Sequence, residues 1–319
     1  MPRNAYRLEL TRCDIAGGDT GGLPTSLLDA IEADGGLWWA SEGYTRPDEI
    51  VAKARAVGAR ALRLDVRELS LLESLPQVRY LHLRSDGRRP PLDPIASLRG
   101  LRALIIETGG LRGELDLLSF PDLRWLRLGL GGKGGQAMLP VMAVGHPALE
   151  WLSVSETKAN TATDIVAGFP RLRTLHVNMA DCLSELGPLA SVMPDLRTVG
   201  LMLTPVRTLN GLVGLEGLEI LNIFGGSVTD LGPLHEMRQL RYARLLLAHL
   251  KSLEPLRGHP ALRMLDLTIE PEVAVLRSIP GLVALGRKKT FDGPFPWPDP
   301  KVVAKDHPMR IEWFRAMRE

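Results

Sequence analysis

The sequence predicts an α/β solenoid, in which short parallel strands stack into one sheet and the chain returns through turns and short helices on the opposite side. Two observations predict this fold. A segment with three spaced apolar residues, such as Leu218–Ile223, recurs along most of the chain. The segment that follows it also repeats, as in Val228–Leu234. An internal period of this kind is the signature of a repeat architecture, so we expect one supersecondary unit per period.

The first half of each coil is predicted to be a strand. The last two apolar residues of the segment alternate, so their side chains enter the core while the side chains between them face outward. The first leucine of the segment recurs every 22 residues, at Leu196, Leu218, Leu240 and Leu262. Further copies begin at Ala59, Val78, Leu101, Leu123, Leu149 and Leu172. About ten coils therefore stack in parallel.

The second half of each coil is too short for more than a tight turn and a short helix. Its expected inward residues are Leu111, Cys182, Val206, Val228 and Leu250, then Leu209, Leu231 and Leu253, then Leu212, Leu234 and Leu256. Each apolar side chain contributes roughly 1.5 to 3 kcal/mol when it is buried. Because a coil can bury its side chains only against its neighbours, no coil is expected to be stable alone.

The ends of the chain do not follow the repeat. We predict an N-terminal cap over residues 1–56, the solenoid over 57–287 and a C-terminal cap over 288–319. The first cap is expected to contain strands at Tyr6–Leu10 and Leu37–Ala40 and a helix that begins near Pro47. In the second cap, Phe291–Pro300 is too rich in proline for a helix, and Ile311–Met317 suits a short amphipathic helix. Caps are needed because an open core end must be covered.

Composition narrows the classes of partner. The chain has 319 residues, 39 basic and 37 acidic, with a formal charge of +2. This balance argues against a nucleic acid or an anionic membrane as the partner. Cys13 and Cys182 form no disulfide framework, and no long apolar segment or export signal is seen, so we expect a cytoplasmic protein. The excess of Arg over Lys, with abundant Ala, Gly and Pro, favours a bacterial source.

From Ala59 to Leu285 the chain resembles bacterial leucine-rich-repeat proteins. The segment Asp230–Leu234 is similar to the return segment of internalin-type repeats, and Glu185–Leu189 and Glu254–Leu256 share the pattern. The resemblance implies a right-handed horseshoe with a concave parallel sheet, and a role in protein recognition. The chain departs from the family at the ninth position, where the usual Asn is replaced by Gly109, Thr157, Ala180, Thr204, Gly226 and Ala248.

Outward positions of the strands supply the candidate binding residues on the concave face. They are Arg63, Tyr80, His82, Arg84, Trp125, Arg127, Trp151, His176, Asn178, Tyr242 and Arg244. Aromatic residues and Arg dominate interface hot spots, and exposed Trp on a sheet face serves no core. We predict a non-catalytic module, monomeric on its own, that binds a protein or peptide, including as an accessory or scaffold subunit. The alternative is that Trp125 and Trp151, expected side by side, pack under the glycine loop 129–135.

That loop carries the sharpest motif of an enzyme. Residues Gly129–Gly134 match the dinucleotide fingerprint, follow a predicted strand and precede Glu156 at the place of a ribose-binding acid. Two observations argue against this function. The leucine repeat continues before and after the loop, and the extra glycines fall in the one lengthened coil, between Leu123 and Leu149. A nucleotide-binding enzyme is therefore an alternative, and no cofactor is expected.

The second strand position offers another alternative. Arg occupies it in most coils, at Arg60, Arg79, Arg102, Arg124, Arg173, Arg197, Arg241 and Arg263. Stacked at strand spacing, these residues would form a ridge able to follow a phosphate backbone. The structural alternative is that the aliphatic carbons of these side chains cover apolar surface and their guanidinium groups pair with acidic side chains.

Histidines and cysteines give little sign of a metal or catalytic site. His82 and His176 face outward but lie four coils apart, too far to share a metal. His146, His259 and His307 each precede proline, which suits turns. Cys13 followed by Asp14 has no histidine that can be placed beside it. We expect no metal site and no catalytic residue.

Overall fold

The structure is a computed structural model. It describes residues 11–13, 24–34, 38–41, 46–65, 68–84, 91–107, 113, 115–129, 145–268, 272–282, 284–287 and 301–302. The chain forms two compact units, Met1–Leu149 and Glu150–Glu319. The expected strand at Tyr6–Leu10, the two C-terminal segments and nearly all of the glycine loop lie outside the described residues.

The first unit contains the strands β1 (Thr11–Cys13), β2 (Trp38–Ser41), β3 (Ala61–Asp65), β4 (Tyr80–Arg84), β5 (Ala103–Glu107) and β6 (Trp125–Gly129). Strands β2 to β6 pair in parallel and in chain order, and β1 pairs antiparallel with β2. Its helices are α1 (Thr25–Ala33), α2 (Pro47–Ala56), η2 (Ser70–Ser74), η3 (Asp93–Ser97) and η4 (Leu117–Ser119). The strand at Trp38 and the helix at Pro47 confirm the sequence prediction.

The second unit contains β7 (Trp151–Ser155), β8 (Thr174–Asn178), β9 (Thr198–Met202), β10 (Ile220–Phe224), β11 (Tyr242–Leu246), β12 (Met264–Leu267), β13 (Ala284–Arg287) and β14 (Lys301–Val302). All pair in parallel and in chain order. The returns contain α4 (Ala162–Val166), α5 (Leu189–Val192), η6 (Asn210–Leu212), η7 (Gly232–Glu236), η8 (Glu254–Leu256) and α6 (Val273–Ser278). Within the described residues, no helix is long and apolar enough to cross a bilayer.

The core lies between the strands and the returns. The constant spacing of the repeat puts Leu221 opposite Val199 on one side and Ala243 on the other, and all three side chains are fully buried. In the returns, Leu231 and Leu234 are likewise buried, and the Asp230 carboxylate accepts a hydrogen bond from the Gly232 amide at 2.8 Å. The predicted strand register is therefore confirmed.

One expected core position is wrong. Cys182 was assigned to the inward position filled elsewhere by Val206 and Val228, but its side chain is only half-buried, and the adjacent Leu183 is the fully buried residue of that coil. This return leads into α5, whereas the returns that begin with Val206 and Val228 lead into the 3-10 turns η6 and η7. The shift by one residue moves Leu183 inward and leaves Cys182 beside it.

Two histidines belong to the core. His146 and His259 are each 1% exposed and occupy the position that Phe120 and Phe169 fill in other coils. In each, Nε2 lies 3.0 to 3.1 Å from the backbone oxygen of the preceding coil, and Nδ1 accepts a backbone amide hydrogen bond at 3.2 Å. Both ring nitrogens are thus satisfied, which lets a polar ring replace an apolar one.

Candidate functional site

The sheet of each unit has an open face, formed by the side chains at the first, third and fifth strand positions, which point away from the core. The predicted contact residues of the first unit on this face are Arg63, Tyr80, His82, Arg84, Trp125 and Arg127. Those of the second unit are Trp151, His176, Asn178, Tyr242 and Arg244. The predicted proximity of Trp125 and Trp151 involves both units and stays a prediction.

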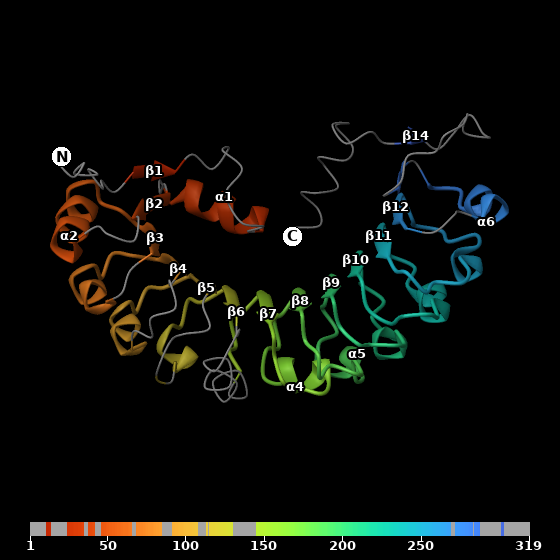
Figure 1. Cartoon of the computed structure of the whole chain (residues 1–319), viewed down its shortest axis with the longest axis horizontal. Coiled ribbons are helices and arrows are strands. Elements are labelled where there is room, and N and C mark those ends of the chain that lie inside the picture. Colours follow the sequence, from red (N-terminus) through yellow and green to blue (C-terminus); the bar gives the residue numbers. More distant parts are fainter. Residues whose placement is uncertain are drawn as a thin grey trace, which may run out of the picture. The chain divides into compact units, whose positions relative to one another are not determined.

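Helix α1 lies on the open face of the first unit, on the opposite side of the strands from the short helices (Figure 1). The indole Nε1 of Trp125 donates to the Ser26 hydroxyl at 3.2 Å. The Tyr80 hydroxyl oxygen lies 3.1 Å from the Ala30 carbonyl oxygen. The expectation that the tryptophans of this face are exposed is wrong, because Trp125 is 7% and Trp151 4% exposed. Tyr80 is fully buried as well.

Asp34, at the C-terminal end of α1, is the anchor of this helix. Its carboxylate accepts two hydrogen bonds from the Arg102 guanidinium, at 2.9 and 3.1 Å, and one from the Tyr80 hydroxyl at 2.8 Å. Arg79 lies 3.8 Å from the same carboxylate, and Arg60 donates to the Asp34 backbone oxygen at 3.0 Å. Burial raises the pKa of Tyr80. Arg60, Arg79 and Arg102 of the predicted ridge are thus engaged in holding α1.

Farther along the strands, His82, Glu107 and Arg127 form a second charged cluster. His82 Nε2 lies 3.0 Å from one Glu107 carboxylate oxygen, and Arg127 lies 3.2 Å from the other. The hydrogen bond from His82, together with the charges of His82 and Arg127, lowers the pKa of Glu107 to about 2. Burial lowers the pKa of Arg127, and Glu107 opposes that effect. Of the other predicted residues of this unit, Arg63 is half-buried and Arg84 is exposed.

In the second unit, Trp151 and His176 meet across neighbouring strands. Their ring centroids are 5.7 Å apart and the ring planes are tilted by 52°. A Cβ atom at Gly200 would come within 2.1 Å of His176 Nδ1, so the glycine on the next strand leaves the space that the imidazole fills. Asn178 donates to the Ser153 hydroxyl at 3.4 Å. Because Trp151 and Ser153 are buried, the half-buried His176 and Asn178 are the members of this group that reach the surface.

Tyr242 and Arg244 lie on β11, next to one another on the open face. The guanidinium of Arg244 lies over the Phe224 ring, 5.9 Å from its centroid, and its Nε lies 3.5 Å from the Asp266 carboxylate. Tyr242 and Phe224 are half-buried. Asp266 is only 4% exposed and lies against Arg244, so the Phe224 ring and the Arg244 guanidinium are the groups that can bind apolar and charged parts of a ligand.

The C-terminal ends of the strands carry a surface that the sequence analysis missed. Glu156, Met179, Leu203 and Gly225 follow β7 to β10, and all have left-handed backbone conformations, with φ between 48° and 66°. Their amides donate to the last carbonyl of the next strand, as from Met179 to Met202 at 2.7 Å. We call Met179, Met202, Leu203 and Phe224 the edge strip. Met179 is 41% and Leu203 48% exposed.

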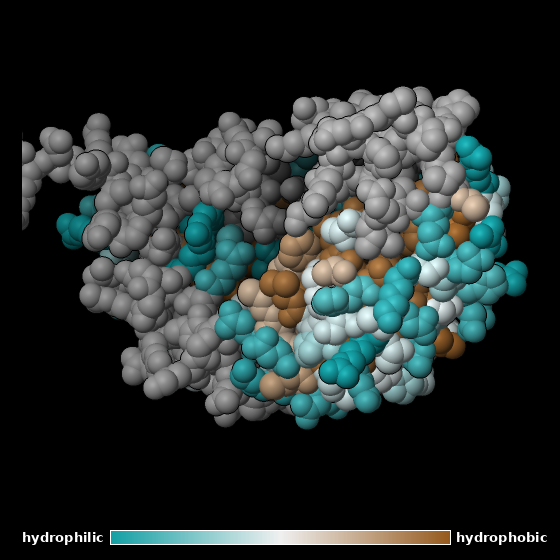
Figure 2. Space-filling model, turned by 45° about the vertical axis from the view of Figure 1, so that its right-hand side comes forward, coloured by the Kyte–Doolittle hydropathy of each residue, from teal (hydrophilic) through white to brown (hydrophobic). Residues whose placement is uncertain are grey.

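The edge strip is apolar surface beside polar groups. Met202 and Phe224 are half-buried on the fifth strand position, directly before the turns that carry Leu203 and Gly225. In Figure 2, apolar surface lies among polar side chains on the part of the molecule that comes forward. In the sequence the strip corresponds to the seventh and eighth residues of each coil, counted from the first leucine. Nothing in residue type alone marks Met179 and Leu203 as exposed.

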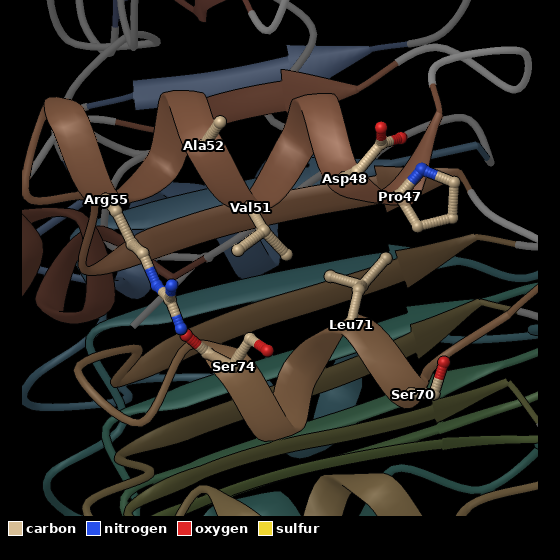
Figure 3. Close-up of a pocket in the computed structure, with 8 residues that line it drawn as sticks. All are labelled: Pro47, Asp48, Val51, Ala52, Arg55, Ser70, Leu71 and Ser74. Carbon is tan, nitrogen blue, oxygen red and sulfur yellow. The ribbon is translucent and has the colours of Figure 1, made fainter.

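A shallow groove lies on the other side of the first unit, between α2 and η2 (Figure 3). It has a volume of about 480 Å³. Val51 and Leu71 point toward one another across it, and the Arg55 guanidinium closes one end by donating to the Ser74 carbonyl at 3.1 Å. The groove has no convergent set of polar groups, so it is less suited to a specific ligand than the open face.

The described residues contain no group of three or more His, Cys, Asp or Glu side chains that could hold a metal ion. Of the dinucleotide fingerprint only Gly129 is described, and its hypothetical Cβ would lie 3.2 Å from the Ile106 carbonyl oxygen. Glu156, the proposed ribose acid, is exposed in a left-handed turn. Gly129 and Glu156 as described therefore do not form a nucleotide-binding site.

No family model matches the chain, and no curated protein matches its sequence. Solved structures do. Drosophila Toll, from the Toll–Spätzle complex, is 18% identical with a TM-score of 0.56, over 83% of this chain and 38% of Toll. A leucine-rich-repeat protein of Leptospira interrogans is 14% identical with a TM-score of 0.52, over 77% of this chain and 64% of that one.

The chain has the leucine-rich-repeat fold. The internalin inlF of Listeria monocytogenes is another similar leucine-rich-repeat structure, with 19% identity and a TM-score of 0.44, over 67% of this chain and 68% of the internalin. The parallel strands, the constant spacing of the repeat and the short return helices of this chain agree with that fold. The similarity to Toll and to the Leptospira protein establishes the fold of the repeats.

Proposed function

We propose that this leucine-rich-repeat chain is a non-catalytic binding module, and that a protein or peptide docks on the open face and edge strip of the second unit. The observation that carries the proposal is the outward placement of Met179 and Leu203. A left-handed conformation costs a residue with a side chain roughly 1 to 2 kcal/mol, and here it holds apolar side chains in solvent. Backbone strain that gains no core contact favours a role in binding.

The neighbouring residues supply specificity. Tyr242, Arg244 and Asp266 lie on β11 and β12, beside the apolar Phe224 on β10. An apolar centre bordered by polar and charged groups is the usual anatomy of a protein interface. Among the similar structures, Toll was solved in complex with Spätzle. We therefore favour a folded or extended polypeptide as the partner, with the chain acting as an accessory or scaffold subunit.

A nucleic acid is less favoured as the partner. In the first unit the Arg ridge is engaged by α1, and in the second unit Arg197 donates to the Gly217 carbonyl at 3.1 Å and lies 3.6 Å from Glu219. Such residues act as structural ties rather than as free phosphate contacts. The cytoplasmic location and bacterial source stay predictions from composition.

Photo-crosslinking tests the proposed site. A photoreactive phenylalanine analogue replaces Leu203 in one variant and Val213 in another, and each is irradiated in a lysate of the source cells. Val213 is a matched control because it is 42% exposed but lies in the return after η6. We expect a protein adduct from position 203 that is missing from position 213. Equal adducts at both positions, or none at 203, would count against the proposal.

A further inference from the structure

Helix α1 occupies the open face of the first unit as a bound ligand would. Its contacts run from Arg60, before β3, to Trp125 on β6. Nine helical residues span about 13 Å, and three strand spacings span about 14 Å, so the helix matches the width of the strands that it crosses. The segments that precede and follow it, residues 14–23 and 35–37, lie outside the described residues.

Recognition of α1 uses few groups, all on one side of the helix. Leu27 and Ile31, four residues apart, are fully buried. Asp34 follows three residues later and receives the hydrogen bonds of Arg102 and Tyr80. Asp29 and Glu32 are exposed on the remaining surface. Two aliphatic side chains and one carboxylate, together with the Ser26 hydroxyl that Trp125 contacts, therefore lie on the buried side of α1.

The helix has little stability of its own. Its N-cap residue, Pro24, makes no side-chain capping bond, and the first turn has no acidic residue and the last turn no basic one. A helix of nine residues without caps is not stable alone in water, since nucleation is costly. Its helical form therefore depends on the surface beneath it.

The surface beneath α1 is built for recognition. Tyr80, Trp125 and Arg102 are the residue types that dominate interface hot spots, and each donates a hydrogen bond to the helix. Arg79 and Arg102 lie within 3.8 Å of the Asp34 carboxylate, and Arg60 donates to the backbone oxygen of the same residue. A segment that only covered the core would need apolar contacts alone. This surface also binds a carboxylate at one end of the helix.

We propose that the open face of the first unit is a helix-binding site whose resident occupant is α1, and that an amphipathic helix of a partner protein exchanges with it. The partner helix carries two aliphatic residues four positions apart and a carboxylate three residues after the second. The charge complementarity between that carboxylate and the guanidinium groups of Arg79 and Arg102 selects this class of partner. The site lies in the first unit, so it is independent of the function proposed for the second unit and is tested with different residues.

The test uses the full-length chain and a labelled helical peptide of residues 24–34, stapled between the exposed positions 29 and 33. The variant Ile31→Asp places a carboxylate at a fully buried position and releases the resident helix. Fluorescence anisotropy should show that this variant binds the peptide about tenfold or more tightly than the wild-type chain. A peptide with Asp34→Asn should bind about tenfold or more weakly, and one with Glu32→Gln, an exposed carboxylate of the same helix, should bind as before.

Three results would overturn the proposal. The first is a folded Ile31→Asp variant that does not bind the peptide, and the second is a variant that no longer folds, since a removable ligand leaves the fold intact. The third is a wild-type dimer in solution formed by exchange of α1 between copies, which would assign the site to a second copy of the chain. Hydrogen exchange on the wild-type chain gives an independent check. The α1 amides should exchange at least about a hundredfold faster than those of β5, and equal protection would make α1 a fixed part of the core.

Discussion

At the scale of single residues, buried polar groups give this fold its sensitivity to pH. His259 fills a position that Phe169 fills in an earlier coil, and burial lowers its pKa from the ordinary value of 6.5. The folded state therefore holds a neutral ring. As the pH falls below about 6.5, the unfolded chain binds a proton that the folded chain does not, so stability is lost toward acid pH.

Replacing His259 by Phe should flatten the pH dependence of unfolding. The slope between pH 6.5 and 5 should fall by up to about 1 kcal/mol per pH unit, because one titrating group is removed. Urea denaturation at pH 7.5, 6.5, 5.5 and 5 measures it, with the exposed His249→Phe as the control. An unchanged slope in the His259 variant would show that the buried ring does not govern acid stability.

Glu107 gives a prediction in a lower pH range. Because its folded pKa is about 2, against an ordinary 4.5, its contribution is present above pH 4.5 and is lost as the pH falls toward 2. Glu107→Gln should cost about 1 to 2 kcal/mol at pH 7, after allowance for its 32% exposed side chain. The difference between wild type and variant should shrink between pH 4.5 and 2 in denaturation experiments. A cost independent of pH would point to packing instead.

At the scale of the element, each coil combines a buried strand centre with an exposed edge. Leu221→Ala should destabilise the chain by about 2 to 5 kcal/mol, because the fully buried leucine leaves a cavity between β9 and β11. Val213→Ala, at a 42% exposed position, should change the free energy of unfolding by less than about 0.5 kcal/mol. Chemical denaturation measures the free energy of unfolding of both variants, and near-equal values would mean that the strand register is misassigned.

The left-handed turns after the strands give a further prediction. Leu203→Gly and Leu203→Ala both remove the exposed side chain, but only glycine adopts a φ of 53° without cost. The Gly variant should therefore be more stable than the Ala variant by about 0.5 to 1 kcal/mol in thermal unfolding, once the entropy of glycine is allowed for. The reverse order would show that the turn is not strained.

The sequence predicted the elements well where the period defines them. The constant spacing of the leucines was enough to place Leu221 inward and Asn222 outward, because strand alternation follows from spacing alone. It did not predict α1 over the open face, since the contact between Asp34 and Arg102 joins residues far apart in the chain and outside the repeat. It did not predict the edge strip, because composition does not show which Met or Leu residues adopt a left-handed backbone conformation.

At the scale of the whole molecule, the repeat is one scaffold that presents two different open faces. In the first unit the face is covered by a helix of the same chain, and the predicted residues Tyr80 and Trp125 hold that helix. In the second unit the predicted residues Tyr242 and Arg244 share the face with an apolar strip. The Asn-poor ninth position does not disturb the strands, because the register from β9 to β12 is continuous.

The most direct test is the affinity of the crosslinked partner, once purified, for the wild-type chain and for the Leu203→Asp and Val213→Asp variants. Both positions are exposed and apolar, so both variants should fold, with matched changes in charge. If the edge strip is the binding site, calorimetry should show a loss of about thirtyfold or more for Leu203→Asp, the size of a hot-spot loss, and no change for Val213→Asp. Equal affinities for all three proteins would contradict the proposed site.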